Sequence, residues 1–178
     1  MTNKELIEKY PWLTPSNRFS GKWITDCIGE DGEEGFWPGE PTKHPEYNYE
    51  FTELDMMPDG WRKQFGEQMC EEIQQELMTW TPDKYKNFRI FDIKEKYGEL
   101  RFYVNMESIK LHKIIRKYMD LSRKTCIVCG EPACWMSKGW ISPYCKECAE
   151  EEYNHHNNLY SEQSDWYEYY TEIKEEES

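Results

Sequence analysis

The sequence predicts an α+β protein in which helices pack on a small antiparallel hairpin and carry a docked cysteine-rich module. Three patterns support this fold class. Apolar residues recur every three or four positions from Trp61 to Trp80, which indicates a long amphipathic helix. Apolar and polar residues alternate between Asn87 and Asn105, as they do in a β-hairpin. Two C-x2-C pairs separated by fifteen residues have the spacing of a four-thiolate metal site.

Length and charge narrow the kind of protein. The chain has 178 residues, a formal net charge of −13 and 16% aromatic residues, which fits one ordinary domain with a small additional module. The excess of acids disfavours nucleic acid or an anionic membrane as a direct partner, because phosphate groups are bound by Lys and Arg. A basic protein partner is favoured instead. No secretion signal and no membrane-length apolar run are evident, so we expect a cytoplasmic protein with reduced cysteines.

Composition along the chain divides it into four expected segments. They are an irregular N-terminal segment with an acidic Gly/Pro loop (1–46), an α/β body (47–123), a four-cysteine zinc module (124–158) and an acidic, aromatic C-terminal segment (159–178). In the first segment, a short helix from Asn3 to Tyr10 is expected to end at Pro11. The acidic loop at 29–45 is either a solvated loop or a contact with a cation or partner.

The α/β body is expected to begin with a short strand at 47–51, followed by the amphipathic helix. Asp59 would cap this helix and Pro82 would stop it. A five-residue connection, 94–98, would join the two strands of the hairpin. A second helix would follow at 108–123. Its apolar face would consist of Leu111, Ile114, Ile115, Tyr118 and Leu121.

The two cysteine pairs predict one structural zinc ion. Its four ligands would be Cys126, Cys129, Cys145 and Cys148. Gly130 permits the left-handed backbone that a C-x2-C turn often needs. The second pair would open a helix over 149–158, which gives a treble-clef-like or zinc-ribbon-like module. Two disulfides or unpaired core thiols are the alternative reading of the same cysteines.

Other side chains of the module are expected to serve packing. Cys134 is a spare thiol, because the two pairs already supply four ligands. Trp135, Trp140 and Ile141 would form the small core of the module. His155 and His156 are expected to be solvated, because adjacent side chains on a helix point about 100° apart and do not easily share one ion.

Acids interleaved with aromatic residues make the C-terminal part the candidate partner-binding surface. From Glu147 onward there are eleven acids and one base, Lys174. Trp166 and Tyr170 are spaced for one face of a helix and are the expected anchors. The alternative is a helix that packs on its own domain with its acids toward solvent. The residues expected to contact a partner are Glu147, Glu150, Glu151, Glu152, Glu162, Asp165, Trp166, Glu168 and Tyr170.

Catalytic motifs are not evident in the sequence. It has no phosphate-binding loop, no dinucleotide fingerprint and no H-E-x2-H zinc motif. Four thiolates fill the coordination shell of zinc and leave no position for a reactive water. The sequence therefore predicts a protein that is not an enzyme and whose zinc holds a short segment in its fold.

Three joined motifs carry a resemblance to a known family. They are Pro58–Ile73 with its PDGWRK opening, Glu95–Tyr103 (EKYGELRFY), and Cys126–Cys148 with Gly139-Trp140 between the cysteine pairs. Over residues 47–150 the chain resembles a family of small phage and prophage proteins, and within it is similar to zinc-binding type II-A anti-CRISPR proteins that inhibit Cas9. The pattern does not extend to the first 45 residues or to the acidic tail.

This resemblance implies an inhibitor in the bacterial host cytosol that contains structural zinc, binds Cas9 through acidic surface and blocks DNA binding or loading. Another basic nucleic-acid-handling protein would satisfy the same charge argument. The alternative is a zinc-ribbon phage accessory protein that binds nucleic acid or another host protein. The module has only Lys124, Lys138 and Lys146 as bases, which is few for phosphate contacts.

Overall fold

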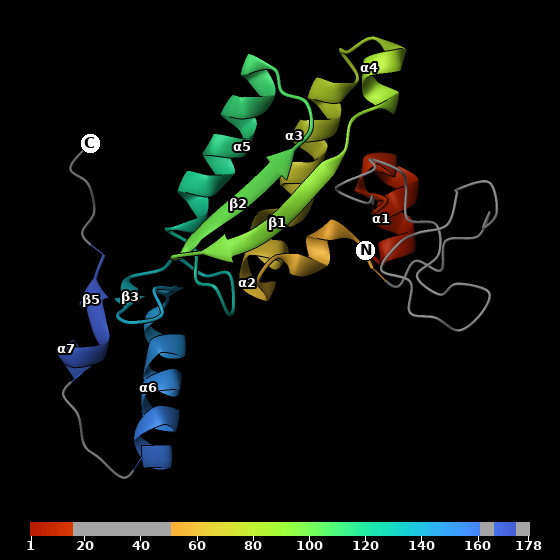
Figure 1. Ribbon diagram of the computed structural model, residues 1–178. Helices are drawn as coiled ribbons and strands as arrows, with labels where there is room; N and C mark the ends of the chain where they lie inside the picture. The colour runs from red at the N-terminus through yellow and green to blue at the C-terminus, as the bar shows by residue number, and fades with distance from the viewer. Residues whose placement is uncertain (16–50, 161–165, 174–178) are drawn as a thin grey trace, which may run out of the picture.

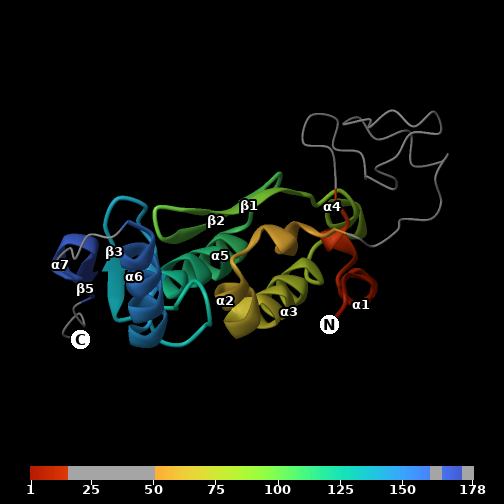
Figure 2. The ribbon, with the colours of Figure 1, turned by 90° about the horizontal axis from the view of Figure 1, so that it is seen from below.

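The computed structural model describes residues 1–15, 51–160 and 166–173. In the body, helices α3 (Glu67–Leu77) and α5 (Ile109–Ser122) lie on one side of a two-stranded antiparallel sheet, β1 (Ile90–Lys96) and β2 (Glu99–Val104) (Figure 1). The cysteine-rich module lies beyond the turn of this hairpin (Figure 2). The predicted mixture of helices and small antiparallel sheets is confirmed. The expected loop at 29–45 and residues 47–50 of the expected strand lie outside the described residues.

The N-terminal helix, α1 (Asn3–Lys9), is confirmed. Thr2 caps it with a capping box, in which its hydroxyl accepts from the Glu5 N–H and the Glu5 carboxylate accepts from the Thr2 N–H. Pro11 ends α1 and begins a 3₁₀ turn, η1 (Pro11–Leu13). This turn buries Trp12 and Leu13 in the same core as the body helices.

The long amphipathic helix consists of three joined pieces. They are α2 (Asp59–Trp61), a π-helical turn η3 (Arg62–Gly66), and α3, which follows the 3₁₀ turn η2 (Glu53–Met56) in the chain. The prediction that Asp59 caps the helix is wrong, because Pro58 occupies the N-cap position and no side chain caps it. The helix also ends at Leu77, before Trp80. Apolar residues at the predicted positions are buried: Trp61, Phe65, Met69, Ile73 and Leu77.

Pro82 does not simply stop a helix, as predicted, but occupies the first position of a new one, α4 (Pro82–Lys86). Thr81 caps α4 by accepting from the Lys84 N–H. Proline is well suited to this position because the backbone N–H there has no partner within a helix, so the lack of an N–H in proline loses no hydrogen bond.

The hairpin is tighter than expected. Lys96 pairs with Glu99, so only Tyr97 and Gly98 form the turn, and the predicted five-residue connection is wrong. Both turn residues have positive φ, 55° for Tyr97 and 73° for Gly98, as type I′ turns require. The Glu95 carboxylate accepts from the Gly98 N–H at 2.6 Å and stabilises the turn. The inner face of the sheet buries Ile90, Ile93, Leu100 and Phe102.

Helix α5 begins after Ser108, whose hydroxyl accepts from the Leu111 N–H. The predicted apolar face is largely confirmed, except that Leu121 is 36% exposed and Ser122 is buried in its place. Ser122 is buried because its hydroxyl accepts from the Leu100 N–H at 2.9 Å and donates to the Met119 carbonyl. One end of β2 is thereby bonded to the last turn of α5.

The module contains a short sheet and a helix. The sheet has the order β4-β3-β5, from strands β3 (Trp135–Ser137), β4 (Pro143–Tyr144) and β5 (Tyr170–Glu172). Helix α6 (Lys146–Tyr160) follows β4, and one turn, α7 (Trp166–Tyr169), precedes β5. The helical spacing of Trp166 and Tyr170 does not continue as a helix beyond Tyr169, because residues 170–172 pair with β3. This tail segment thus forms an edge strand of the module sheet.

Within the described ranges, none of the helices has both the length and the apolar character that crossing a bilayer requires.

Candidate metal centre

Four cysteine sulfurs converge in the module. The Sγ atoms of Cys126, Cys129, Cys145 and Cys148 all lie within 4.8 Å of one another, and those of Cys129 and Cys145 are 3.6 Å apart. A tetrahedral ion with metal–sulfur bonds of about 2.3 Å separates its sulfurs by about 3.8 Å. The six described cysteines are all free, so the disulfide alternative is excluded for them. The four predicted ligands are therefore placed as a four-thiolate metal site requires.

The first pair of cysteines lies in a tight knuckle. The Gly130 N–H donates to the Cys126 carbonyl at 3.1 Å, and Gly130 has the predicted positive φ, 88°. Two further backbone bonds fix the knuckle in the module. The Cys126 N–H donates to the Glu131 carbonyl at 2.7 Å, and the Ile127 N–H donates to the Pro143 carbonyl at 2.9 Å. Since Pro143 belongs to β4, this bond holds the knuckle beside the second cysteine pair.

The second pair lies at the start of α6. Cys145 precedes the helix, and Cys148 is in its first turn. The Cys148 N–H donates to the Cys145 Sγ at 3.4 Å, and the Ala149 N–H donates to the Cys145 carbonyl at 3.0 Å. The N-terminal end of a helix carries partial positive charge, which stabilises thiolates there.

The pKa values of the clustered thiols shift in different directions, because burial, hydrogen bonds and neighbouring thiolates act on them together. Burial raises the pKa of Cys126, but backbone N–H groups of the knuckle and of the Cys145 region donate to its sulfur and bring the pKa down to about 7. Burial also raises the pKa of Cys145 and that of Cys148, and negative charge on Cys126 raises both further. Four thiolates at this spacing repel one another unless a cation lies between them. A bound metal ion supplies that charge and deprotonates its thiol ligands.

Backbone contacts hold the knuckle against the body. The Gly60 N–H, at the start of α2, donates to the Ile127 carbonyl at 3.0 Å, and the Trp61 Nε1 donates to the Thr125 carbonyl at 2.9 Å. A Cβ atom on Gly60 would lie 2.2 Å from the Cys126 carbonyl oxygen and 2.7 Å from the Gly130 nitrogen. Only glycine permits this approach. Sequence analysis missed this role; a glycine in the first turn of a strongly amphipathic helix was the available signal.

Several module residues differ from their expected roles. Trp140 is 79% exposed and Ile141 is 39% exposed, so the prediction that they form the module core is wrong. They lie in the turn between β3 and β4, where chain reversal directs side chains outward. Trp135 is half-buried against the Trp166 ring, at 5.3 Å between centroids. Cys134 is outside the four-sulfur cluster, as expected of a spare thiol.

The two histidines are outside the cluster as well. His155 is exposed, as expected. His156 is half-buried, and its ring packs edge-on against Tyr169 with centroids 4.8 Å apart, so the expectation that it is solvated is wrong. His156 is covered because α7 lies beside α6 and places Tyr169 next to this part of the helix.

The expected partner-binding residues fall into two groups. The acids at the start of α6 are exposed: Glu147, Glu150, Glu151 and Glu152. Tyr170, by contrast, is only 3% exposed and packs against Tyr144 and Trp166, with centroid separations of 5.9 Å and 4.6 Å. Trp166 is half-buried between Trp135 and Tyr153. These two predicted anchors therefore pack within the module. Glu162, Asp165 and the side chain of Glu168 lie outside the described residues.

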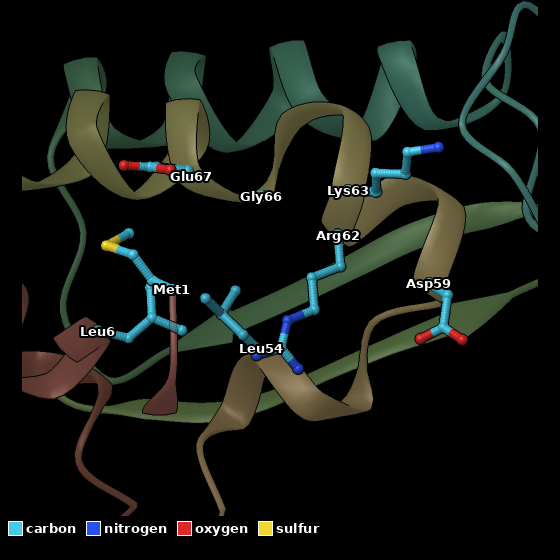
Figure 3. Close-up of a pocket in the computed structure, with 8 residues that line it drawn as sticks. All are labelled: Met1, Leu6, Leu54, Asp59, Arg62, Lys63, Gly66 and Glu67. Carbon is cyan, nitrogen blue, oxygen red and sulfur yellow. The ribbon is translucent and has the colours of Figure 1, made fainter. Parts of the chain in front are cut away.

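A pocket of about 320 Å³ lies on the body, beside the π-helical turn (Figure 3). Its lining residues are Met1, Leu6, Leu54, Asp59, Arg62, Lys63, Gly66 and Glu67. Most of its charged groups already have partners. Arg62 binds Asp55 and Asn3, Glu67 binds Lys9 at 3.2 Å, and Lys63 donates to the Cys129 carbonyl at 3.4 Å. The pocket thus offers little unsatisfied polarity to a ligand.

Comparison with known proteins finds no counterpart for this chain: no family model, no curated protein and no solved structure matches it.

Proposed function

We propose that the four-cysteine cluster binds one zinc ion and that this ion is structural. The sulfur spacing supports a closed tetrahedral site, in which no coordination position remains for water or substrate. The order of knuckle, hairpin and helix, with Cys148 on the helix, favours a treble-clef-like arrangement over a zinc ribbon. The bound ion stabilises a segment with a small apolar core of its own and holds it in contact with the body.

On this scaffold, the protein acts by binding another protein. The observation that supports this most directly is the exposure of four acids on the first two turns of α6. Cys148 ties that end of the helix to the metal site, so these carboxylates have a defined position. A row of carboxylates in a fixed position is complementary to a basic surface and accelerates association with it. No reaction is assigned to the site.

Cas9 is the proposed partner, on the basis of the family resemblance. Cas9 holds its guide and target in a positively charged channel, which suits an acidic ligand. By covering part of this channel, the protein would block DNA binding or loading in the bacterial host cytosol. The two proposals are separable, because a zinc-containing, partner-binding protein need not act on Cas9.

The proposal is tested with the zinc-loaded full chain and a Cas9–guide RNA complex. We expect saturable binding in biolayer interferometry and loss of target cleavage at matching concentrations. Replacing Glu147→Lys and Glu151→Lys together should weaken binding by about tenfold, because rim charges chiefly set association rates. The control is Glu8→Lys with Glu107→Lys, which makes the same charge change at two exposed acids outside the module. Equal affinities for the two double variants, or no binding to Cas9, would refute the acidic-surface proposal.

A further inference from the structure

Charge is distributed unevenly along the chain. Residues 84–146 contain fourteen Lys and Arg against six Asp and Glu, a formal charge of +8, whereas the remaining residues carry −21. The net charge of −13 is therefore the sum of a basic part and an acidic part of the chain. Half of the excess of +8 lies in residues 107–124, which include α5. The hairpin, residues 87–105, has four bases and three acids. The hairpin is thus not acidic, and exclusion of nucleic acid on the basis of net charge does not apply to it, because binding depends on the local surface.

The hairpin exposes one face. Helices α3 and α5 lie on the inner side of β1 and β2, and no described element lies on the outer side (Figure 2). The outer face has the cross-strand pairs Asp92–Tyr103, Lys94–Arg101 and Lys96–Glu99. In the central pair two cations are directly opposite each other. Like charges in this position destabilise a sheet unless an anion lies between or beside them.

Acids on this face are less exposed than the cations. The Glu99 side chain is only 10% exposed and accepts from both Arg101 and Arg123, each at 3.3 Å. The Asp92 side chain is 19% exposed, whereas that of Lys94, its partner, is 45% exposed. Arg101 and Arg123 thus share Glu99, and Lys94 pairs with Asp92. The outer surface of the hairpin is consequently positive where solvent reaches it.

Exposed aromatic rings accompany these cations. Tyr103 is 47% exposed, and the Lys94 Nζ lies 5.7 Å from its ring centroid. Tyr97 is 69% exposed, and the Lys96 Nζ lies 5.4 Å from its ring centroid. Tyr97 also has φ of 55°, a region that residues other than glycine rarely adopt. This φ belongs to the type I′ turn, which places Tyr97 at the tip of the hairpin.

The cysteine module continues the same surface. A Cβ atom on Gly98 would lie 3.4 Å from the Ile141 Cγ2 and 3.2 Å from the Met136 Sδ, so the two hairpin turns touch. Trp140, next to Ile141, is 79% exposed, and Lys138, two residues before it in the same turn, is also exposed. Since consecutive Cα atoms are 3.8 Å apart, the backbones at Tyr97 and Trp140 lie within roughly 15 Å of each other.

We infer that this surface binds single-stranded nucleic acid. We call it the aromatic–basic strip, and its residues are Tyr103, Lys94, Arg101, Lys96, Tyr97, Lys138 and Trp140. The lysines and Arg101 would contact phosphates, and the three rings would stack on unpaired bases. Sites for single strands combine these two elements, and duplex DNA does not present its base faces for stacking. The strip shares no residue with the exposed acids of α6, so variants in one surface leave the side chains of the other unchanged.

The test measures fluorescence anisotropy of a labelled fifteen-nucleotide oligothymidine with the zinc-loaded full chain, at 50 mM and 200 mM salt. We expect saturable binding that weakens at the higher salt, because phosphate contacts release counterions. Trp140→Ala should weaken binding by about 5- to 150-fold, which corresponds to the ~1–3 kcal/mol of one stacked base. Its matched control is Ile109→Ala, which removes a side chain that is 81% exposed on α5.

A second pair of variants tests the cations. Lys96→Glu with Lys138→Glu should abolish binding at 200 mM salt, whereas Lys86→Glu with Lys113→Glu, at exposed lysines outside the strip, should reduce it only slightly. Retained zinc and an unchanged circular dichroism spectrum establish that each variant is folded. Three results would overturn the inference: no binding at 50 mM salt, equal binding by Trp140→Ala, or equal competition by duplex DNA or polyglutamate.

Discussion

Replacing Gly60 with alanine tests whether the module and the body are joined as the structure describes. The new Cβ would lie 2.2 Å from the Cys126 carbonyl oxygen, 2.7 Å from the Gly130 nitrogen and 2.8 Å from the Ile127 carbonyl carbon. All three are backbone atoms, so no side chain can rotate away. Restoring ordinary contact requires a shift of more than 1 Å between α2 and the knuckle, by comparison with the usual 3.4 Å or more for a Cβ.

Such a shift would lengthen two hydrogen bonds, from the Gly60 N–H to the Ile127 carbonyl and from the Trp61 Nε1 to the Thr125 carbonyl. Each buried group that loses its partner costs about 1–3 kcal/mol. Alanine gains at most about 1 kcal/mol in helix propensity. We therefore expect Gly60→Ala to lower the free energy of unfolding by about 3 kcal/mol.

The assay is urea denaturation of the zinc-loaded protein, followed by tryptophan fluorescence. A loss of about 3 kcal/mol should lower the urea midpoint by about 1–3 M, since m-values are about 1–3 kcal/mol/M. Gly66→Ala is the matched control. There the new Cβ would meet only the Arg62 side chain, at 3.5 Å and 3.9 Å, so this variant should be as stable as the wild type or more stable. Equal midpoints for the two variants would refute the close approach of Gly60 to the knuckle.

Three further predictions follow from the same structure. Cys145→Ser should abolish stoichiometric zinc in elemental analysis, whereas Cys134→Ser should retain one ion per chain; zinc loss in both would show that the fifth thiol is also a ligand. Tyr170→Ala should lower the free energy of unfolding by about 3 kcal/mol, as for other large buried aromatics, whereas Tyr170→Phe should be close to wild type; an unaffected alanine variant would contradict burial of this ring. Burial raises the pKa of Asp55, but hydrogen bonds from the Thr52 N–H, Arg62 and Asn3 outweigh burial and lower the pKa. The ionised Asp55 carboxylate therefore stabilises the folded protein above pH 3.8, the ordinary pKa. This stabilisation is lost as the pH falls through the lowered pKa. Asp55→Asn should thus destabilise the protein in chemical denaturation at pH 7 and lose this effect in strong acid, and a pH-independent difference would exclude the charge of Asp55 as its cause.

Local patterns in the sequence predicted the four clustered cysteines and most of the secondary structure. The C-x2-C spacing identified four sulfurs that the structure places within 4.8 Å of one another. Periodicity identified the buried faces of α3 and α5, and alternation identified β1 and β2. These features depend on residues that are close in the chain, where the 3.6- and 2-residue repeats determine which side chains share a face.

Errors occurred where a residue's role depends on a distant segment. Trp166 and Tyr170 have helical spacing, but β3 offers a strand edge, and residues 170–172 pair with it. Leu121 fits the apolar repeat of α5, yet Ser122 is buried in its place because it reaches the Leu100 N–H. The exposure of Trp140 likewise depends on where two hairpin turns meet.

The chain alone thus determined which cysteines could share an ion and which faces of the helices are apolar, because those properties follow from spacing. Only the tertiary structure decided that the tail completes the module sheet, that Gly60 lies against Gly130, and that cations and aromatic rings of the hairpin join those of the module in one strip. Each of these depends on contacts between segments many residues apart. Net charge is a sum over the whole chain, and periodicity describes residues that are close in the sequence. Neither contains information about contacts between distant segments.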